Sequence, residues 1–386
     1  MKKDINARRD FLMQAGIASV AAMGFAAGDV KAETLPPPPE FKPQHKVRFS
    51  VCGVSHDHIH GMIAAMKRGG GELVNAWGAE PDKMATFRQR YPEARILATQ
   101  DEVINDDTQL ILTSHVPNER THIGIRAMKA GKDVLADKPG IITLKDLALV
   151  RKTIKDTGRK YGIQYSERLD VRAAVYAGEL IKQGAIGKVI QTINLAPHQI
   201  VQGGGDAGGG SKRPEWFWDD RLFGGILTDI GSHQVDQFLY YTGSKSAEIV
   251  ASQIANIGFP DRPRFQDFGD MTLRGDAGLG YVRLDWYTPK GLGTWGDGRL
   301  FVLGTEGYIE VRKYTNVAVN KQGNNLFLVD QTGARFIDCS NGDLPFGPQF
   351  IADIVNRTET AQSQEMALLA AELSIKAQVG AKAVKI

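Results

Sequence analysis

Residues 47–61, with the sequence VRFSVCGVSHDHIHG, decide the fold. The apolar run at 47–53 predicts a buried strand, and Gly53 predicts a tight turn at its end. Outward from this stretch, strands and helices alternate. Strands are predicted at 72–77, 94–98, 109–113 and 132–136, with helices between them, notably at 118–130 and 144–155. This alternation indicates a doubly wound parallel sheet, in which ligands bind at the carboxyl ends of the strands.

The pattern changes after about residue 166. Few helices interrupt the strands that follow, which is typical of an antiparallel sheet. The predicted elements are a helix at 171–183, strands at 189–195, 249–257, 271–273, 279–286, 300–303 and 308–311, and helices at 349–357 and 365–379. We therefore expect a Rossmann-type dinucleotide-binding domain at 47–166. An open-faced, mostly antiparallel α+β domain is expected at 167–386, with its last helices packing back.

The composition excludes several classes of protein. The chain has 386 residues and a net charge of only +3, from 47 Lys+Arg and 44 Asp+Glu. A nucleic-acid-binding protein normally carries a basic face, so no nucleic-acid partner is expected. The two cysteines, Cys52 and Cys339, cannot form a disulfide framework and leave room for one bridge at most.

Residues 1–32 are typical of an export signal. An apolar run at 15–27 precedes the small-residue cleavage pattern at 30–32. Residues 8–12, RRDFL, fit the twin-arginine motif, and a general secretory signal with a chance arginine pair is the alternative. The apolar run is shorter than the ~20 residues that span a bilayer, so we expect a periplasmic or secreted protein without a stable membrane anchor. Prolines in residues 33–46 predict an extended arm, either a spacer or a segment lying across the body or a neighbouring subunit.

The loop after the first strand is the expected dinucleotide site. A glycine-rich turn lets backbone N–H groups approach a pyrophosphate at a helix N-terminus. Of the pattern G-x-G-x-x-G only Gly53 is kept, with Ser55 and His58 at the other two glycine positions. The acid that normally bonds the adenosine ribose is replaced by Gly78, and Glu80 follows two residues later. The cofactor contacts expected here are Gly53, Ser55, His56, His58 and Glu80.

His56, His58 and His60 allow a second interpretation of the same loop. Alternate spacing places three imidazoles on one side of an extended segment, as in a metal site. Loop polarity, donation to phosphate and contacts at the helix N-terminus explain them equally well. No carboxylate or cysteine cluster is visible nearby in the sequence, so we predict no metal ligand and keep the metal site as an alternative.

A second stretch with residues suited to catalysis lies at 223–236. It predicts a helix after a Gly-Gly turn, with Asp229, His233 and Asp236 at positions i, i+4 and i+7 on one face. A histidine with a carboxylate one turn before it can be tuned for proton transfer. A solvated polar face, or a core histidine bonded by an aspartate, is the alternative.

Three segments together resemble the Gfo/Idh/MocA family (glucose–fructose oxidoreductase, inositol dehydrogenase and rhizopine catabolism proteins). They are the loop at Gly53, the sequence AGKDVLADKP at 130–139, and GGILTDIGSH at 224–233. The second matches A-G-K-x-V-x-x-E-K-P with Asp137 in place of Glu, and the third matches G-G-x-x-x-D-x-G-x-H. Residues 116–118 with His122 are similar to the family's T-P-N-x-x-H turn.

The resemblance implies an NAD(P)-dependent oxidoreductase acting on a sugar or polyol. It implies that Lys138, Asp229 and His233 meet as catalytic residues in a cleft between the domains. It also implies that Pro117, Asn118, Asp137 and Lys138 contact NAD or NADP. The substrate contacts expected in the same cleft are Glu167, Arg168, His198, Trp216 and Asp236.

Export constrains the expected reaction. Outside the cytoplasm there is no pool of NAD to exchange, so we expect a tightly held cofactor and a redox-neutral cycle. The alternatives are a sugar-binding protein without redox chemistry and a metal-dependent lyase or hydrolase on the same fold. The open sheet face leads us to expect a homo-oligomer, by analogy with the family.

Overall fold

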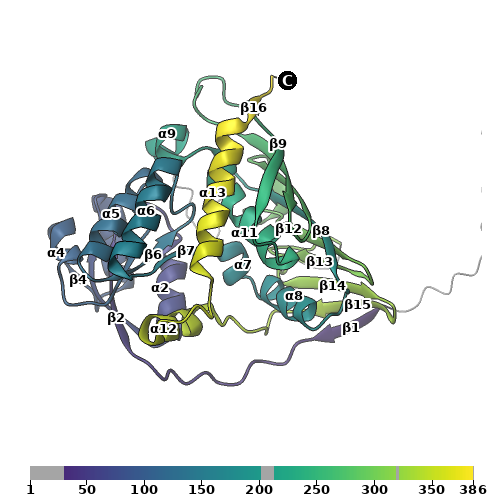
Figure 1. Cartoon of the computed structure of the whole chain (residues 1–386), viewed down its shortest axis with the longest axis horizontal. Helices are drawn as coiled ribbons and strands as arrows, with labels where there is room; N and C mark the ends of the chain where they lie inside the picture. The colour runs from purple at the N-terminus through teal and green to yellow at the C-terminus, as the bar shows by residue number, and fades with distance from the viewer. Residues whose placement is uncertain (1–29, 201–212, 319–320, 386) are drawn as a thin grey trace, which may run out of the picture.

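The computed structural model describes residues 30–200, 213–318 and 321–385, which form two packed domains (Figure 1). All but the last three residues of the predicted export signal lie outside the described residues. None of the described helices combines the length and the apolar character that crossing a membrane requires. Cys52 and Cys339 are free and buried.

The first domain is built on a six-stranded parallel sheet in the order β4-β3-β2-β5-β6-β7. Its strands are β2 (Val47–Cys52), β3 (Gly71–Trp77), β4 (Arg95–Ile96), β5 (Leu110–Thr113), β6 (Asp133–Asp137) and β7 (Tyr161–Gln164). Its helices are α2 (Ile59–Arg68), α3 (Pro81–Arg90), α4 (Gln100–Ile104), α5 (Pro117–Lys129) and α6 (Leu144–Thr157). Every residue of β5, β6 and β7 is buried, because helices cover both faces of the sheet. The predicted doubly wound fold is confirmed.

The second domain contains a ten-stranded sheet in the order β1-β15-β14-β13-β12-β8-β11-β10-β9-β16. Its strands are β1 (Lys31–Thr34), β8 (Val189–Pro197), β9 (Ala247–Ala255), β10 (Phe268–Gly275), β11 (Leu279–Asp285), β12 (Arg299–Gly304), β13 (Tyr308–Arg312), β14 (Asn325–Asp330), β15 (Gly333–Asp338) and β16 (Lys382–Ala383). Three neighbouring pairs are parallel (β1/β15, β8/β11 and β9/β16), and the other pairs are antiparallel. The predicted mostly antiparallel sheet is therefore confirmed.

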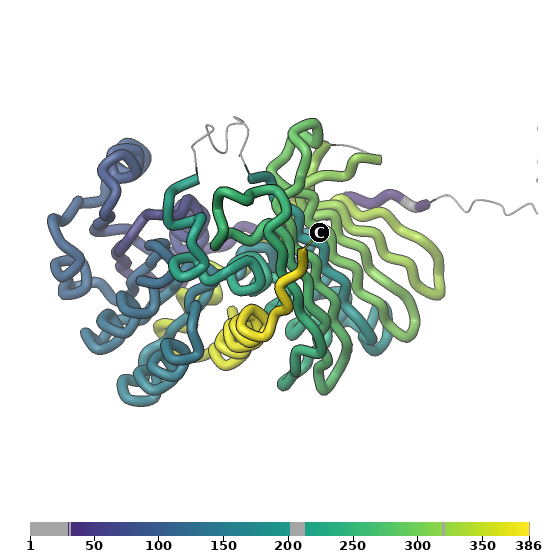
Figure 2. The backbone as a smooth tube through the Cα atoms, turned by 90° about the horizontal axis from the view of Figure 1, so that it is seen from above, coloured from purple at the N-terminus to yellow at the C-terminus, as the bar shows by residue number. Residues whose placement is uncertain are grey.

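Seven α-helices accompany this sheet in the described part of the chain. They are α7 (Ser166–Leu169), α8 (Arg172–Lys182), α9 (Asp220–Phe223), α10 (Ile226–Asp229), α11 (Gly231–Thr242), α12 (Phe346–Asn356) and α13 (Gln364–Gly380). Among them, α11 and α13 pack on the sheet on the side that faces the first domain (Figure 1). Figure 2 shows both domains from above. The single helix predicted at 223–236 is instead two, α10 and α11, which meet at Ile230.

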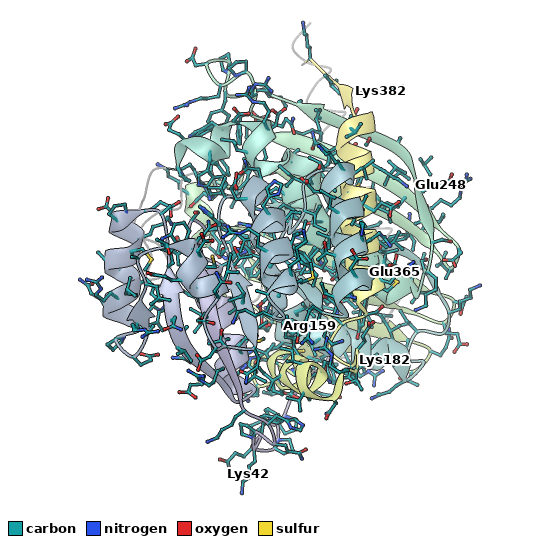
Figure 3. The ribbon with its side chains drawn as sticks, turned by 60° about the vertical axis from the view of Figure 1, so that its left-hand side comes forward. Lys42, Arg159, Lys182, Glu248, Glu365 and Lys382 are labelled. Atoms are coloured by element: carbon teal, nitrogen blue, oxygen red, sulfur yellow. The ribbon has the colours of Figure 1, made fainter. Side chains whose placement is uncertain are left out.

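The last two long helices join the domains. Helix α12 packs on α2 so closely that a Cβ at Gly347 would lie 1.9 Å from the carbonyl oxygen of Ala65. Helix α13 contacts α6 and α11, and Arg151 on α6 pairs with Glu365 at the start of α13. Figure 3 labels Glu365. These contacts fix the walls of the space between the domains.

The Pro-rich arm crosses the body from one sheet to the other. Strand β1 pairs in parallel with β15, and the chain then runs along the outside to β2 (Figure 1). Lys42 of this arm projects from the surface (Figure 3). The predicted end of the export signal, residue 32, falls inside β1, a strand that the sequence analysis did not predict.

Candidate active site between the domains

A cavity of about 390 Å³ lies where the carboxyl ends of β2, β5 and β6 face the second domain. This volume is within the range of small-molecule sites. Among the predicted site residues, those that line it are Ser55, His56, His58, Pro117, Lys138, His198, Trp216 and Asp229. The structure thus brings together predicted cofactor, catalytic and substrate residues from both domains.

Lys138 and Asp229 form a buried pair across the domain boundary. Lys138 follows β6, and its Nζ donates a hydrogen bond of 2.8 Å to Oδ1 of Asp229 at the end of α10. Burial alone would raise the pKa of Asp229, but the charge and hydrogen bond of Lys138 lower it, so the carboxylate is ionised. The turn before α10 requires glycine, because a Cβ at Gly225, where φ is +83°, would lie 2.3 Å from Gln378.

His233 is a neutral imidazole beside this pair. The residue is 2% exposed, and its Nδ1 is buried with no hydrogen-bond partner among the described residues. Burial lowers the pKa of His233 well below its usual value, and the positive charge of Lys138 lowers it further. The negative charge of Glu167 raises this pKa but does not offset the burial. The imidazole is therefore unprotonated at neutral pH and carries a free lone pair, and it lies one helical turn after Asp229 without lining the cavity itself.

The loop after β2 keeps glycine only where the turn demands it. Gly53 has φ of +102°, and a Cβ there would lie 2.4 Å from Cβ of His115. Ser55, at the second glycine position, places its Oγ 2.8 Å from Nδ1 of His115. His58, at the third, is the residue before α2 and makes no side-chain cap. The degenerate motif therefore preserves the turn while adding side chains to the loop.

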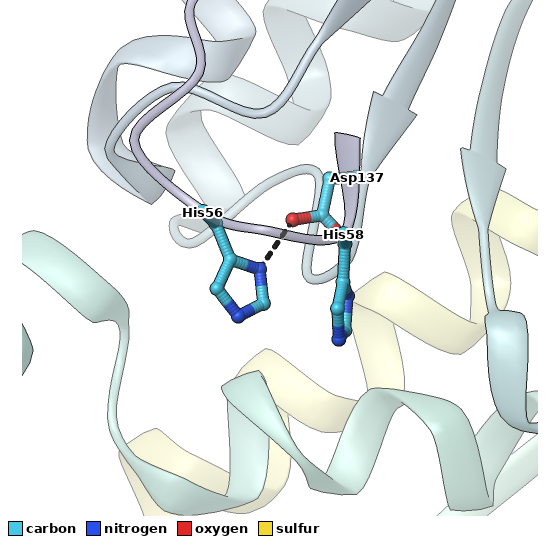
Figure 4. A group of neighbouring side chains, drawn as sticks. All are labelled: His56, His58 and Asp137. Atoms are coloured by element: carbon cyan, nitrogen blue, oxygen red, sulfur yellow. Dashed lines mark hydrogen bonds and ion pairs between the residues drawn. The ribbon is translucent and has the colours of Figure 1, made fainter. Parts of the chain in front are cut away.

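Asp137 holds two of the three loop histidines (Figure 4). Its Oδ2 lies 2.7 Å from Nδ1 of His56, and its Oδ1 lies 2.9 Å from Nδ1 of His58. Arg120 and Ser114 also bond its Oδ2, at 3.1 and 2.9 Å. Burial would raise the pKa of Asp137, but Arg120 and the two histidines hold it well below its usual value.

His60 does not join this group, because its Nδ1 lies 3.1 Å from the hydroxyl of Tyr91. Sequence analysis missed Arg120 and Ser114. Asp137 in place of the family's Glu was the departure from the motif at this position.

Two buried acceptors follow β3 and β5, the strands on either side of β2. Glu80 precedes α3, which follows β3, and its Oε2 is buried without a partner in the described part of the chain. The same is true of Oδ1 of Asn118 in the first turn of α5. Unpaired buried acceptors are costly unless a ligand supplies donors. Both positions were predicted as cofactor contacts.

Three predicted substrate residues are instead bonded to other side chains and do not line the cavity. Arg168 donates from Nε and Nη2 to the two carboxylate oxygens of Asp236, at 2.6 and 2.9 Å. Glu167 accepts from Lys313 at 2.6 Å and from Gln234 at 3.0 Å. Because each charge is paired and buried, these contacts bind α7 to α11 and to the second sheet.

His198 and Trp216 belong to an aromatic wall of the cavity. The His198 ring lies 5.2 Å from that of Trp286 and 4.7 Å from that of Trp295. Burial lowers the pKa of His198 to about 4, so it is neutral at neutral pH. Tyr314 continues the wall, with its ring 4.3 Å from that of Trp295. Sequence analysis missed Trp286, Trp295 and Tyr314. For the two tryptophans, the only signal was the scarcity of this residue type in the chain.

Comparison with known proteins shows the family of the chain. A family model described as the GFO/IDH/MocA C-terminal domain matches residues 175–310. A crystal structure described as an oxidoreductase from Erwinia carotovora atroseptica SCRI1043 is 40% identical, with a TM-score of 0.83, and the match covers 88% of this chain and 100% of that chain. The chain belongs to the GFO/IDH/MocA family. The motifs of this family at 130–139 and 224–233 are those that bring Lys138 to Asp229.

Other similar proteins are more distant. The 1,5-anhydro-D-fructose reductase of Ensifer adhaerens is 25% identical over 220 residues, which is 55% of this chain and 61% of that protein. The chain thus spans about three fifths of the length of that curated relative. A levoglucosan dehydrogenase solved with NADH and levoglucosan has a TM-score of 0.71 at 15% identity, covering 87% of this chain and 98% of that one. At that identity the likeness shows the fold alone.

Proposed function

We propose that this family member is an NAD(P)-dependent oxidoreductase that transfers hydride between a sugar or polyol carbon and the nicotinamide. The observation that carries the proposal is the Lys138–Asp229 pair, which faces the cavity at the carboxyl ends of the parallel strands beside neutral His233. The names of the reductase and dehydrogenase relatives support it.

The described residues fit a dinucleotide at its adenosine end. The unpaired acceptors of Glu80 and Asn118 are suited to the hydroxyl and amino donors of a nucleotide. Glu80 follows the second strand, where an acid that bonds the ribose 2′-hydroxyl favours NAD over NADP. When bound, the nicotinamide supplies the hydride acceptor or donor.

The chain's own residues then handle the proton. A carbinol oxygen must lose its proton as the carbon loses hydride. His233 is neutral and can accept that proton, while the amine of Lys138 stabilises the charge that develops on the oxygen. Asp229 orients the amine through its 2.8 Å hydrogen bond. The aromatic wall formed by His198, Trp216, Trp286 and Trp295 suits the apolar face of a sugar ring.

We further propose export by the twin-arginine route, with a tightly held cofactor and return of the hydride to the same or another substrate. The RRDFL motif at residues 8–12 supports this proposal. The uncovered sheet face supports self-association into a homo-oligomer. Bound nucleotide in protein purified from the periplasm, or its absence there, tests the export and retention parts together.

The test of the activity is a comparison of Lys138→Met with the wild-type chain. Nicotinamide absorbance is followed while a panel of sugars and polyols is added. We expect the substitution to lower kcat by about 10²–10³-fold, the usual share of a donor that stabilises charge developing in the transition state. Exposed Lys152→Met is the matched control. A wild-type chain that binds no dinucleotide, or a Lys138→Met variant with wild-type kcat, would refute the proposal and favour a binding protein.

A further inference from the structure

The imidazoles of His56 and His58 form a pair whose purpose the proposed reaction leaves open. Their ring centroids lie 4.0 Å apart at an interplanar angle of 48°. One nitrogen of each ring and one carboxylate oxygen of Asp137 lie within 4.8 Å of one another. Dinucleotide loops place glycine where His58 stands, because the third glycine of the motif lets the helix pack closely on the strand. Two imidazoles at this point therefore call for a separate explanation.

The hydrogen bonds to Asp137 determine which nitrogens are free. Each ring uses Nδ1 toward this carboxylate, at 2.7 Å for His56 and 2.9 Å for His58. A carboxylate accepts, so Nδ1 of each ring carries a hydrogen, and Nε2 is the nitrogen left to bind a metal ion. Figure 4 shows the far nitrogens of both rings pointing away from Asp137 to the same side. Both histidines line the cavity, so these nitrogens are presented toward bound molecules.

We infer that His56 and His58 bind one divalent transition-metal ion, such as Zn²⁺ or Co²⁺, through their Nε2 atoms, with Asp137 as the carboxylate that orients both rings. Metal-binding histidines almost always donate their other ring nitrogen to a carboxylate or carbonyl, as both rings do here. Imidazole suits zinc, cobalt, nickel and copper, whereas Mg²⁺ and Ca²⁺ prefer oxygen.

The surroundings of the pair are consistent with such an ion. Asp137 is already saturated by Arg120, Ser114 and the two histidines, so it supports the ligands rather than binding the ion itself. Asp170 and Asp229 line the same cavity but already accept hydrogen bonds from Gln164 and Lys138, so neither is counted as a ligand. Remaining positions open to the cavity would take water or adjacent oxygens of a polyol.

The experiment is metal titration of the full chain after chelator treatment, in the absence of dinucleotide and sugar. Zn²⁺ binding is measured by calorimetry, and Co²⁺ binding is followed by its visible absorption, which reports nitrogen ligation. We expect one equivalent bound by the wild type. His56→Ala and His58→Ala should each weaken binding at least about 100-fold, and Asp137→Asn about 10–100-fold, as for other partners of metal ligands.

Matched variants separate ligation from folding. His60→Ala removes the third histidine of the loop, which bonds Tyr91 instead, and should bind as the wild type does. The glutamine amide in His56→Gln can still donate to Asp137, but it offers no imidazole nitrogen to a metal ion. This variant should therefore fold normally and bind the metal ion weakly. Absence of saturable binding by the wild type, or equal binding by His56→Gln and His60→Ala, would overturn the inference. Because the readout uses neither dinucleotide nor sugar, either result leaves the proposed oxidoreductase activity standing.

Discussion

Asp236→Ala tests whether the buried charges of Arg168 and Asp236 stabilise the fold or contact the substrate. Sequence analysis predicted Arg168 and Asp236 as substrate contacts, whereas the structure pairs them with each other through two hydrogen bonds of 2.6 and 2.9 Å. Their side chains are only 9% and 5% exposed. Truncating Asp236 would leave the guanidinium buried against Tyr240, whose ring centroid lies 4.3 Å away, without a counter-charge.

The expected loss of stability is large. Removing one partner of a buried ion pair costs about 3–5 kcal/mol, because the remaining charge stays desolvated. For domains of about 150–250 residues this corresponds to a decrease in Tm of roughly 6–20 °C. Replacing both partners with apolar residues, as in Arg168→Met with Asp236→Leu, should restore most of the loss, since such replacements are often neutral or stabilising.

Thermal unfolding followed by circular dichroism measures these changes. The control is Asp156→Ala, which removes an exposed partner of Lys152 and should cost about 1 kcal/mol or less. If Asp236→Ala shifted Tm no more than this control and instead raised the KM for sugar, the reasoning would be refuted. Asp236 would then be a substrate contact, as the sequence predicted.

Three further predictions concern the cavity and its rim. Acidification from about pH 6.5 to pH 4 should destabilise the fold, because His198 takes up a proton in the unfolded chain but not in the native protein, where its pKa is lowered to about 4. The free energy of unfolding measured in urea should therefore change less with pH in His198→Gln, by about 1.4 kcal/mol per pH unit within that window. Gly53→Ala should lower Tm and weaken dinucleotide binding in a fluorescence titration, since its φ of +102° and the 2.4 Å approach to His115 strain any side chain; an unchanged Tm would contradict this. Glu80→Ala should weaken NAD binding about tenfold in the same titration and leave NADP less affected, whereas equal losses would argue against a ribose contact.

Local pattern was sufficient to predict most of the fold. The fully apolar run that became β5, and the alternation of strands with helices, specify a buried parallel sheet without any knowledge of partners. Strand β1 could not be predicted in this way. It has four residues, and its pairing with β15 joins segments about 300 residues apart, which no local periodicity encodes.

The candidate site was likewise predictable within its motifs and not where distant segments meet. The approach of Lys138 to Asp229 was anticipated because both belong to motifs with a known meeting point. The capture of His56 and His58 by Asp137 depends on contacts across 81 and 79 residues, and the loop sequence alone suggested His60 as their companion. Arg168 and Asp236 were predicted to contact the substrate, but they bond each other. Charged residues near a cleft can pair with one another instead of with a ligand.

The position of β1 has a consequence for the order of events in the life of the chain. Its partner strand, Gly333–Asp338, emerges late in synthesis, so this edge can close only when nearly the whole chain has been made. An export signal at residues 1–32 would then be joined to an edge that closes late in synthesis. Cleavage after residue 32 would remove two of the four residue pairs along this edge. Hydrogen exchange at residues 333–338, before and after processing, would show whether maturation loosens this edge.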